Sequence, residues 1–294
     1  MLASCNRHMF VLLALRQIGA QTYPIHLLEV VVVDDSDEAA SAELASMLHA
    51  HQDMLRLQLL HLPSADRGSA TSSRGVNAAL AVRLVTLGKR ASIGAKRNAA
   101  VEAARGDVLV HWDDDDLHHP DRVHKQAGPI LTGVANATVL RQSHIAKLAL
   151  DGTVVFFHER GGGGPFLGSL AYRRSLATEN GGFAAVSLGE DIEFADRFLQ
   201  TCHQLIQLSL PSVYVRHGSN TWQWSAEMES AARLVTAPPP SWVLAGDLLA
   251  ALKLAHIDMV RRPSCPPVEL HLPASFRRQS FPFMPSLCCA GLED

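Results

Sequence analysis

The sequence lacks the features that mark membrane proteins, nucleic-acid-binding proteins and zinc proteins. Its 294 residues carry a formal net charge of −3, which provides no general attraction for a polyanion. The apolar run at residues 9–15 is too short to span a bilayer, and it has neither the basic segment nor the cleavage site of a signal peptide. The 5 cysteines include no CxxC pair. We expect no nucleic-acid partner and no membrane span, with the cytoplasm as the location, or an unknown location if a targeting segment precedes Met1.

Two further absences limit the classes of enzyme to which the chain could belong. The histidines at positions 111, 118, 119 and 124 match neither HExxH nor HxHxDH, which argues against a zinc hydrolase. The first strand is followed by Ser4-Cys5-Asn6-Arg7, which is not a glycine-rich phosphate loop. A nucleotidyltransferase on an α/β sheet would be expected to have such a loop, so this class is only an alternative.

The first 130 residues alternate between strand and helix patterns. Residues 27–35 (LLEVVVVDD) contain an unbroken β-branched run, typical of a strand buried on both faces of a parallel sheet. Helical spacing flanks it at 10–21 and 37–50, and further strands are predicted at 54–62 and 107–112. Ser92 predicts the N-cap of a helix that Gly106 closes, and Pro120 suits the first turn of another. We therefore predict an α/β fold, with a Rossmann-like, mixed but mainly parallel sheet flanked by helices.

The second half of the chain shows a different pattern of predicted elements from the first. Antiparallel strands are predicted across residues 139–155 with a turn at Asp151-Gly152, followed by a strand at 166–172. A helix is expected at 188–202, a short strand at 213–217 and another helix at 242–260. From residue 238 the chain is Pro-rich and becomes an irregular tail.

Four consecutive aspartates, Asp113, Asp114, Asp115 and Asp116, follow the strand at 107–112. Their charges repel one another, so beside a buried strand they need a cation. In an extended strand end the side chains alternate, which would place Asp113 and Asp115 on one face and the other two on the opposite face. Two carboxylates on one face suit a hard cation such as Mg²⁺ or Mn²⁺. The alternative is a solvated acidic loop or a helix cap.

Other charged residues also stand at element ends. Asp34 and Asp35 end the VVVV strand, and the carboxyl ends of parallel strands share one edge of a sheet, although both could simply cap the next helix. Lys96 and Arg97 lie near the start of a helix, where they indicate either an anion site or a solvated basic face.

In the second half, Glu190 and Asp191 open a helix, where they could serve as capping residues, or one of them as a general base. His217 follows a strand and is either a metal ligand or a surface histidine.

Taken in order, these motifs resemble the family-two, A-type-fold glycosyltransferases. The resemblance spans residues 1–222 and is carried by NRHMFVLLALRQIGAQTYP, LEVVVVDDSD, SIGAKRNAAVEAARGDVLVHWDDDDLHHPDR, FLGSLAYRR, GGF, GEDIEF and VRHGSNT. It implies an enzyme that transfers a sugar from a nucleoside-diphosphate sugar to a hydroxyl acceptor and inverts the anomeric configuration.

The resemblance also implies roles for particular residues. Asp34 and Asp35 match the acidic pair that contacts the nucleotide, and Lys96 or Arg97 would lie near the nucleotide or its diphosphate. Asp113 and Asp114 would complete the contacts to the nucleotide sugar.

The resemblance also implies which residues bind the metal and which catalyse the reaction. Asp113 and Asp115 match the DxD motif and, with His217, would hold Mg²⁺ or Mn²⁺. Asp191 matches the general base, with Glu190 beside it at the acceptor.

The resemblance leads to a division of the chain. We expect a catalytic domain over residues 1–224, in which 64–91 form an inserted segment with a partial helix at 77–87. Residues 225–294 are expected to form a helical, Pro-rich extension that is disordered in part. Besides the nucleotidyltransferase, the alternative function is a non-catalytic homologue that binds a metal or a nucleotide sugar.

Overall fold

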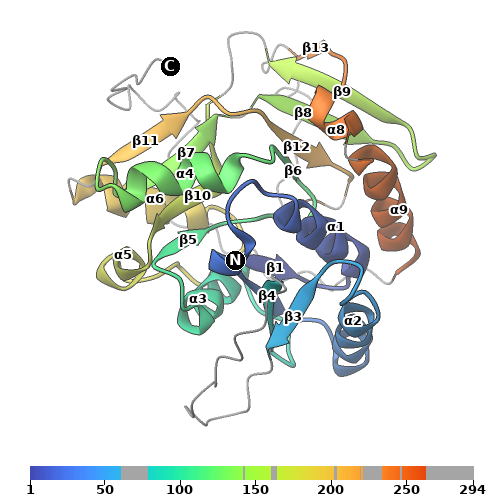
Figure 1. Ribbon diagram of the computed structural model, residues 1–294, viewed down its shortest axis with the longest axis horizontal. Helices are drawn as coiled ribbons and strands as arrows, with labels where there is room; N and C mark the ends of the chain where they lie inside the picture. Colours follow the sequence, from blue (N-terminus) through green and yellow to red (C-terminus); the bar gives the residue numbers. More distant parts are fainter. Residues whose placement is uncertain are drawn as a thin grey trace.

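The computed structural model describes residues 1–60, 79–141, 143–159, 164–201, 204–218, 220, 234–245 and 247–262 (Figure 1). The helices are α1 His8–Gly19, η1 Ile25–Leu27, α2 Glu38–Ala50, α3 Ile93–Ala103, α4 Arg122–Leu131, α5 Arg174–Glu179, α6 Glu190–Gln200, α8 Ser241–Ala245 and α9 Leu248–Arg261. The strands are β1 Leu2–Ser4, β2 Glu29–Asp34, β3 Leu57–Leu60, β4 Leu80–Thr86, β5 Val108–Val110, β6 Leu117–His118, β7 Ala137–Arg141, β8 His144–Leu148, β9 Val154–Glu159, β10 Pro165–Arg173, β11 Leu205–Leu208, β12 Ser212–Arg216 and β13 Leu234–Thr236.

The VVVV run forms β2, inside a parallel sheet of order β1-β2-β4-β3. Val30 and Val32 belong to the core beneath α1 and α2, whereas Val31 and Val33 belong to the core on the α3 side. All four are at most 3% exposed. The prediction of a strand buried on both faces is confirmed, because a parallel sheet is covered by helices on both sides.

The helix predicted at 77–87 is wrong. Residues 80–86 form β4, which pairs in parallel with β2 on one side and β3 on the other. The alanine and leucine content suggested a helix, but the two neighbouring strands supply hydrogen bonds to both edges of this segment. The part of the proposed insertion at 64–78 lies outside the described residues.

A second sheet, of order β11-β7-β10-β5, continues the first one through Met1. The Met1 nitrogen donates to the carbonyl oxygen of Val110 at 2.8 Å, and the Trp112 nitrogen donates to the carbonyl oxygen of Met1 at 3.0 Å. This is the pattern of a parallel pair, so β5 runs beside β1 in the same direction. The carboxyl ends of β1, β2 and β5 therefore meet at one edge, as the sequence predicted.

The third sheet has the order β13-β9-β8-β12-β6, and α8 and α9 pack beside it. The predicted turn between β8 and β9 includes Gly152, whose φ of +82° favours glycine. Figure 1 shows α9 lying against α1, where Leu252 packs with Phe10 and Leu13 in one core cluster. The predicted helix at 242–260 is thus present as two helices.

The fold is the predicted mixed α/β arrangement, with parallel strands flanked by helices. The division at residue 224 and the tail from 263 lie outside the described residues, so the division into two parts stays a prediction. Among the helices of the described ranges, none is long and apolar enough to cross a membrane.

Candidate functional site

Asp34 lies at the end of β2 and is fully buried. Its two carboxylate oxygens accept hydrogen bonds from the hydroxyls of Ser36 at 2.7 Å and Ser41 at 2.6 Å. These bonds join the strand end to α2, whose own N-cap is Asp37. Asp34 therefore holds the loop before α2, whereas the cap of this helix is Asp37.

Asp35 has cationic partners instead. Its carboxylate accepts hydrogen bonds from Lys96 Nζ at 3.0 Å, Arg90 Nη1 at 2.5 Å and the Ala91 backbone nitrogen at 2.9 Å. Lys96 is 6% exposed and also donates to the carbonyl oxygen of Ser4 at 3.3 Å, so it links β1, β2 and α3. Burial lowers the pKa of Lys96, and the neighbouring Asp35 opposes that shift. The structure thus brings Asp35 and Lys96 together at the sheet edge.

The four aspartates do not extend β5. The strand ends at Val110, and residues 113–116 form a turn in which the Asp116 nitrogen donates to the Asp113 carbonyl oxygen at 3.4 Å. The alternation expected for an extended end is therefore wrong, because a turn directs neighbouring side chains differently. Asp114 and Asp115 face the same arginine, while Asp113 faces another.

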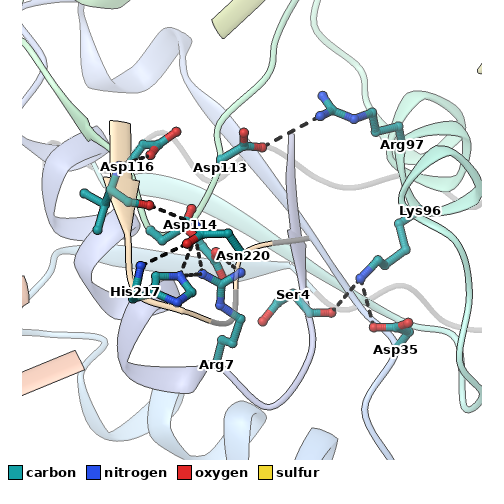
Figure 2. A network of polar contacts seen from close by, with 12 residues as sticks. Ser4, Arg7, Asp35, Lys96, Arg97, Asp113, Asp114, Asp116, His217 and Asn220 are labelled. Carbon is teal, nitrogen blue, oxygen red and sulfur yellow. Dashed lines mark hydrogen bonds and ion pairs between the residues drawn. The ribbon is translucent and has the colours of Figure 1, made fainter. Parts of the chain in front are cut away.

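Arg7 is a cation that forms ion pairs with Asp114 and Asp115. Its Nη1 lies 3.2 Å from Asp114 Oδ1, and its Nη2 contacts Asp115 Oδ2. His217 Nε2 lies 2.9 Å from Asp115 Oδ2 and 3.1 Å from Arg7 Nη2, so the three groups form a triangle. Figure 2 shows Arg7 and His217 pointing toward the same corner of the turn.

The two carboxylates that Arg7 contacts differ in protonation behaviour. Burial raises the pKa of Asp114 to about 7, although Arg7 opposes the shift. Burial also acts on Asp115, but Arg7 and the contact with His217 outweigh it and hold the pKa of Asp115 below its usual range. Asp115 is therefore the carboxylate that stays ionised at neutral pH.

Asp116 points away from this triangle (Figure 2). Its Oδ1 accepts a hydrogen bond from the Val215 nitrogen at 2.9 Å, and its carbonyl oxygen accepts one from Gln17 at 3.0 Å. Burial raises the pKa of Asp116 well above its usual value, with Asp115 adding to the effect. Asp116 thus anchors β12, and with it His217, to the turn.

A second arginine, Arg97, lies between the turn and α6. Its Nη2 is 3.8 Å from Asp113 Oδ1, its Nε is 3.2 Å from Glu190 Oε1, and its Nη1 contacts His111 Nδ1. Arg97 is 8% exposed and Glu190 is 4% exposed. Although burial opposes it, the carboxylates of Glu190 and Asp113 raise the pKa of Arg97. Arg97 therefore links the aspartate turn to the start of α6.

Asp191 stands in the first turn of α6, next to Glu190, and is partly exposed. Its Oδ1 accepts a hydrogen bond from the Ile192 nitrogen at 2.8 Å. Burial, with the charge of Asp191, raises the pKa of Glu190 to about 7, while Arg97 opposes the shift. Of the two acidic residues, Asp191 is the one that an acceptor can reach from solvent.

The start of α6 is held against α3 by several contacts. Asn98 and Phe183 exchange two hydrogen bonds of 2.8 Å, from Asn98 Nδ2 to the Phe183 carbonyl oxygen and from the Phe183 nitrogen to Asn98 Oδ1. The Gly94 nitrogen donates to the Val186 carbonyl oxygen at 3.0 Å. A Cβ atom at Gly94 would lie 1.8 Å from the Ala184 carbonyl oxygen, so only glycine allows this approach. We call these contacts the α3 clamp.

Asp115 and His217 can hold a divalent ion together, because a carboxylate oxygen suits Mg²⁺ and Mn²⁺, an imidazole nitrogen suits transition-metal ions, and the two atoms lie 2.9 Å apart. Asp113, the third predicted ligand, faces Arg97 instead. Within the described ranges, no group of three or more His, Cys, Asp and Glu side chains is arranged around a metal position. Two protein ligands are nonetheless usual where substrate phosphates and water complete the shell.

Three residues that sequence reasoning did not single out belong to the site. Arg7 pairs with Asp114 and Asp115, Arg90 contacts Asp35, and Asn220 accepts from the His217 nitrogen at 2.9 Å. Arg7 could have been noticed as an arginine directly after the first strand. The sequence carries a weaker signal for Asn220, because this side chain accepts a hydrogen bond from the backbone of His217 and such a contact follows no characteristic residue spacing.

A large surface cavity of about 800 Å³ lies elsewhere, lined among others by Asn98, Glu102, Arg173, Arg174 and Thr178. None of the predicted site residues lines it. It shares Asn98 with the α3 clamp, and none of the three residues of the triangle lines it.

Comparison with protein families identifies residues 64–187 as matching the model described as glycosyl transferase family 2. The matched range includes Lys96, Arg97 and the aspartate turn, and it includes the whole segment that we had predicted as an insertion. No curated protein matches the chain.

Solved structures resemble the fold at low sequence identity. S. aureus TarS residues 1–349 in complex with UDP is 15% identical with a TM-score of 0.50, over 74% of this chain and 60% of that chain. The same fragment in complex with UDP-GlcNAc is 15% identical with a TM-score of 0.51, over 85% of this chain and 64% of that chain. The mannosyltransferase PcManGT from Pyrobaculum calidifontis, in complex with GDP-Man and Mn²⁺, is 18% identical with a TM-score of 0.53. The match covers 88% of this chain and 69% of that chain. The chain thus spans about 60% of the first TarS fragment, and the likeness shows a common fold.

Proposed function

We propose that the protein is a metal-dependent, inverting glycosyltransferase that uses a nucleoside-diphosphate sugar, because residues 64–187 match the glycosyl transferase family 2 model. The observation that carries the proposal is the approach of Asp115 and His217 to 2.9 Å, across 102 residues of sequence. They meet at the sheet edge that also holds Asp35, Lys96 and the start of α6.

The donor side of the site is the edge formed by β1, β2 and the turn. Asp35 and Lys96 would contact the nucleotide, with Asp113 and Asp114 near its ribose and diphosphate. Asp34 would support this edge through its serine hydrogen bonds. Since the similar structures contain UDP, UDP-GlcNAc and GDP-Man, UDP-GlcNAc and GDP-Man are the first donors to test here.

Asp115 and His217 would hold Mg²⁺ or Mn²⁺. When bound, such an ion supplies charge neutralisation for the diphosphate leaving group. Asp115 suits this role because it is the turn carboxylate whose pKa lies below its usual range. Asp116 keeps β12 and the turn in register, and Asn220 fixes the backbone of His217.

Asp191 would act as the general base. An ionised carboxylate can take the proton from an acceptor hydroxyl as this hydroxyl attacks the anomeric carbon. The bond to the diphosphate breaks in the same displacement, so the configuration inverts and no covalent enzyme intermediate is needed. Glu190 lies behind Asp191 and is paired with Arg97, which suits a supporting role better than proton transfer.

The test is turnover of UDP-GlcNAc and GDP-Man, with and without Mn²⁺, across a panel of hydroxyl acceptors. We expect release of nucleoside diphosphate that stops when EDTA removes the ion. Release of pyrophosphate would support the nucleotidyltransferase instead. Donor binding by calorimetry with no turnover on any acceptor would support the non-catalytic homologue, which is favoured by one observation, the contact of Arg7 with Asp115.

A further inference from the structure

Arg7 holds a place that the metal proposal assigns to an ion. The side chain leaves the chain between β1 and α1, where Arg7 is itself the N-cap residue of α1. The guanidinium lies 5.0 Å from the centre of the Phe10 ring, and this ring lies 5.5 Å from the His217 ring. Arg7 is thus carried by α1 to the corner where Asp115 and His217 meet.

The atoms of Arg7 lie where a bound ion would need access. A divalent ion held by Asp115 Oδ2 and His217 Nε2 must use lone pairs of these two atoms. Arg7 Nη2 contacts the first atom and lies 3.1 Å from the second. The imidazole nitrogen has a single lone pair, so it cannot bind an ion while it faces Arg7. The carboxylate oxygen has a second lone pair, but an ion bound there would lie against the positive guanidinium.

The charges also show that one cation can replace the other. Asp115 is 7% exposed, so its carboxylate requires a cation nearby in every state of the site. Arg7 supplies one positive charge, and a divalent ion supplies two. Whichever cation is present pairs with Asp115, which makes an exchange between the two cations possible without leaving this carboxylate unpaired.

The fit of Arg7 is incomplete, as expected for a partner that can leave. Within the described part of the chain, Arg7 Nε is buried without a hydrogen-bond partner, and so is Asp114 Oδ2. The side chain is 24% exposed, so it has a path toward solvent. Arginine also has a long flexible stem, which lets the guanidinium move while α1 stays in place.

We propose that Arg7 and the divalent ion compete for Asp115 and His217, so that the ion binds only when the Arg7 guanidinium turns out of the triangle. This inference rests on the proposed metal site. It makes Arg7 the residue that sets the affinity for the ion, and it gives the site a metal-free form that is already neutralised.

The experiment measures Mn²⁺ binding directly, from the electron paramagnetic resonance signal of free Mn²⁺, with purified full-length chain and no donor. Arg7→Met keeps the apolar stem and removes the charge. We expect it to bind Mn²⁺ about tenfold more tightly than the wild type or better, within the usual range of coupling between two sites. The control is Arg16→Met, which removes the same charge from an exposed position of α1 and should leave the affinity within about twofold of the wild type.

The outcomes separate the two proposals. If Arg7→Met binds Mn²⁺ no more tightly than the wild type, Arg7 only orders the carboxylates and the competition is refuted, while the metal site stands. If neither the wild type nor any variant binds Mn²⁺, the metal site is refuted and the competition with it. Asp115→Asn in the Arg7→Met background should remove the added binding, because it takes away the shared ligand.

A measurement on the wild type keeps the test valid if Arg7→Met does not fold. Side-chain ¹⁵N resonances of arginine report whether a guanidinium is held, and the Arg7 signal is identified by its loss in Arg7→Lys. On titration with diamagnetic Mg²⁺ we expect this signal to move from a held to a solvent-exchanging guanidinium. A signal that is unchanged at saturating Mg²⁺ would refute the competition.

Discussion

The aspartate turn has an arginine on each side, and the two arginines differ in what they hold. Arg7 contacts Asp114 and Asp115, two neighbours in one turn, together with the imidazole of His217. Arg97 contacts Asp113 and Glu190, which come from separate elements, and lies beside the α3 clamp. The Arg7 side is a local cluster of possible metal ligands, whereas the Arg97 side joins α3 to α6.

This difference assigns different tasks to the two sides. A change on the Arg7 side should alter the response to a divalent ion. A change on the Arg97 side should alter the position and protonation of the residues at the start of α6. The predictions below test whether the two sides separate in this way.

The largest effect is expected at Asp191. Asp191→Asn keeps the size of the side chain but removes the base, so we expect kcat to fall about 10²–10⁴-fold with Mn²⁺ affinity unchanged. Steady-state kinetics measure the change in kcat, and a Mn²⁺ titration measures the affinity for the ion. Transfer at the full rate would show that Asp191 is not the base.

Arg97→Met is expected to reduce stability strongly. It leaves Glu190 buried without its cation, and removal of one partner of a buried pair costs about 3–5 kcal/mol of the free energy of unfolding. Denaturant unfolding measures the loss, and Arg105→Met, at an exposed position, is the matched charge control. Adding Glu190→Gln to Arg97→Met should recover part of the loss. No recovery would mean that Arg97 stabilises the fold through other contacts.

Glu190 should make stability depend on pH. Its folded pKa of about 7 exceeds the ordinary value of 4.5, so the folded chain binds more protons than the unfolded chain between these values. The free energy of unfolding contributed by this group therefore falls as pH rises from about 4.5 to 7, by up to a few kcal/mol in total. The difference between wild type and Glu190→Gln, measured by urea unfolding at several pH values, should show this slope. A difference that does not change with pH would contradict the raised pKa.

The smallest effect is expected from the α3 clamp. Gly94→Ala places a Cβ against the Ala184 backbone, and we expect a loss of about 1–3 kcal/mol in the free energy of unfolding. Gly19→Ala is the matched control, because nothing lies within 4 Å of a Cβ there, and it should be neutral or stabilising by up to about 1 kcal/mol. Equal stability of the two variants would show that the loop before α6 moves freely and that the clamp positions nothing.

Much of the fold was predictable because its signals are local. The VVVV run, the N-cap at Ser92 and the acidic start of α6 each determine an element from a few neighbouring residues. The strand β4 was missed because its state depends on β2 and β3 as partners on both edges. Pairing between distant segments has no local signature, so the composition of residues 77–87 misled the prediction.

The same reason limits what could be known of the site. The sequence predicted that Asp35, Lys96 and the aspartates would gather at one edge, and the structure brings them there. It could not show that Arg7, 108 residues from Asp115, contacts this carboxylate. Nor could it show the turn at 113–116, because a run of four aspartates reads equally well as an extended end.

The most direct measurement is the melting temperature of the wild type and of Asp115→Asn, each with UDP or GDP, in Mn²⁺ and in EDTA. We predict that a nucleoside diphosphate raises the melting temperature of the wild type only when Mn²⁺ is present, since ligands that bind the folded state stabilise it. Asp115→Asn should lose this dependence on Mn²⁺. A nucleotide-induced rise of equal size in EDTA, or in Asp115→Asn with Mn²⁺, would contradict a metal-bound diphosphate at Asp115 and His217.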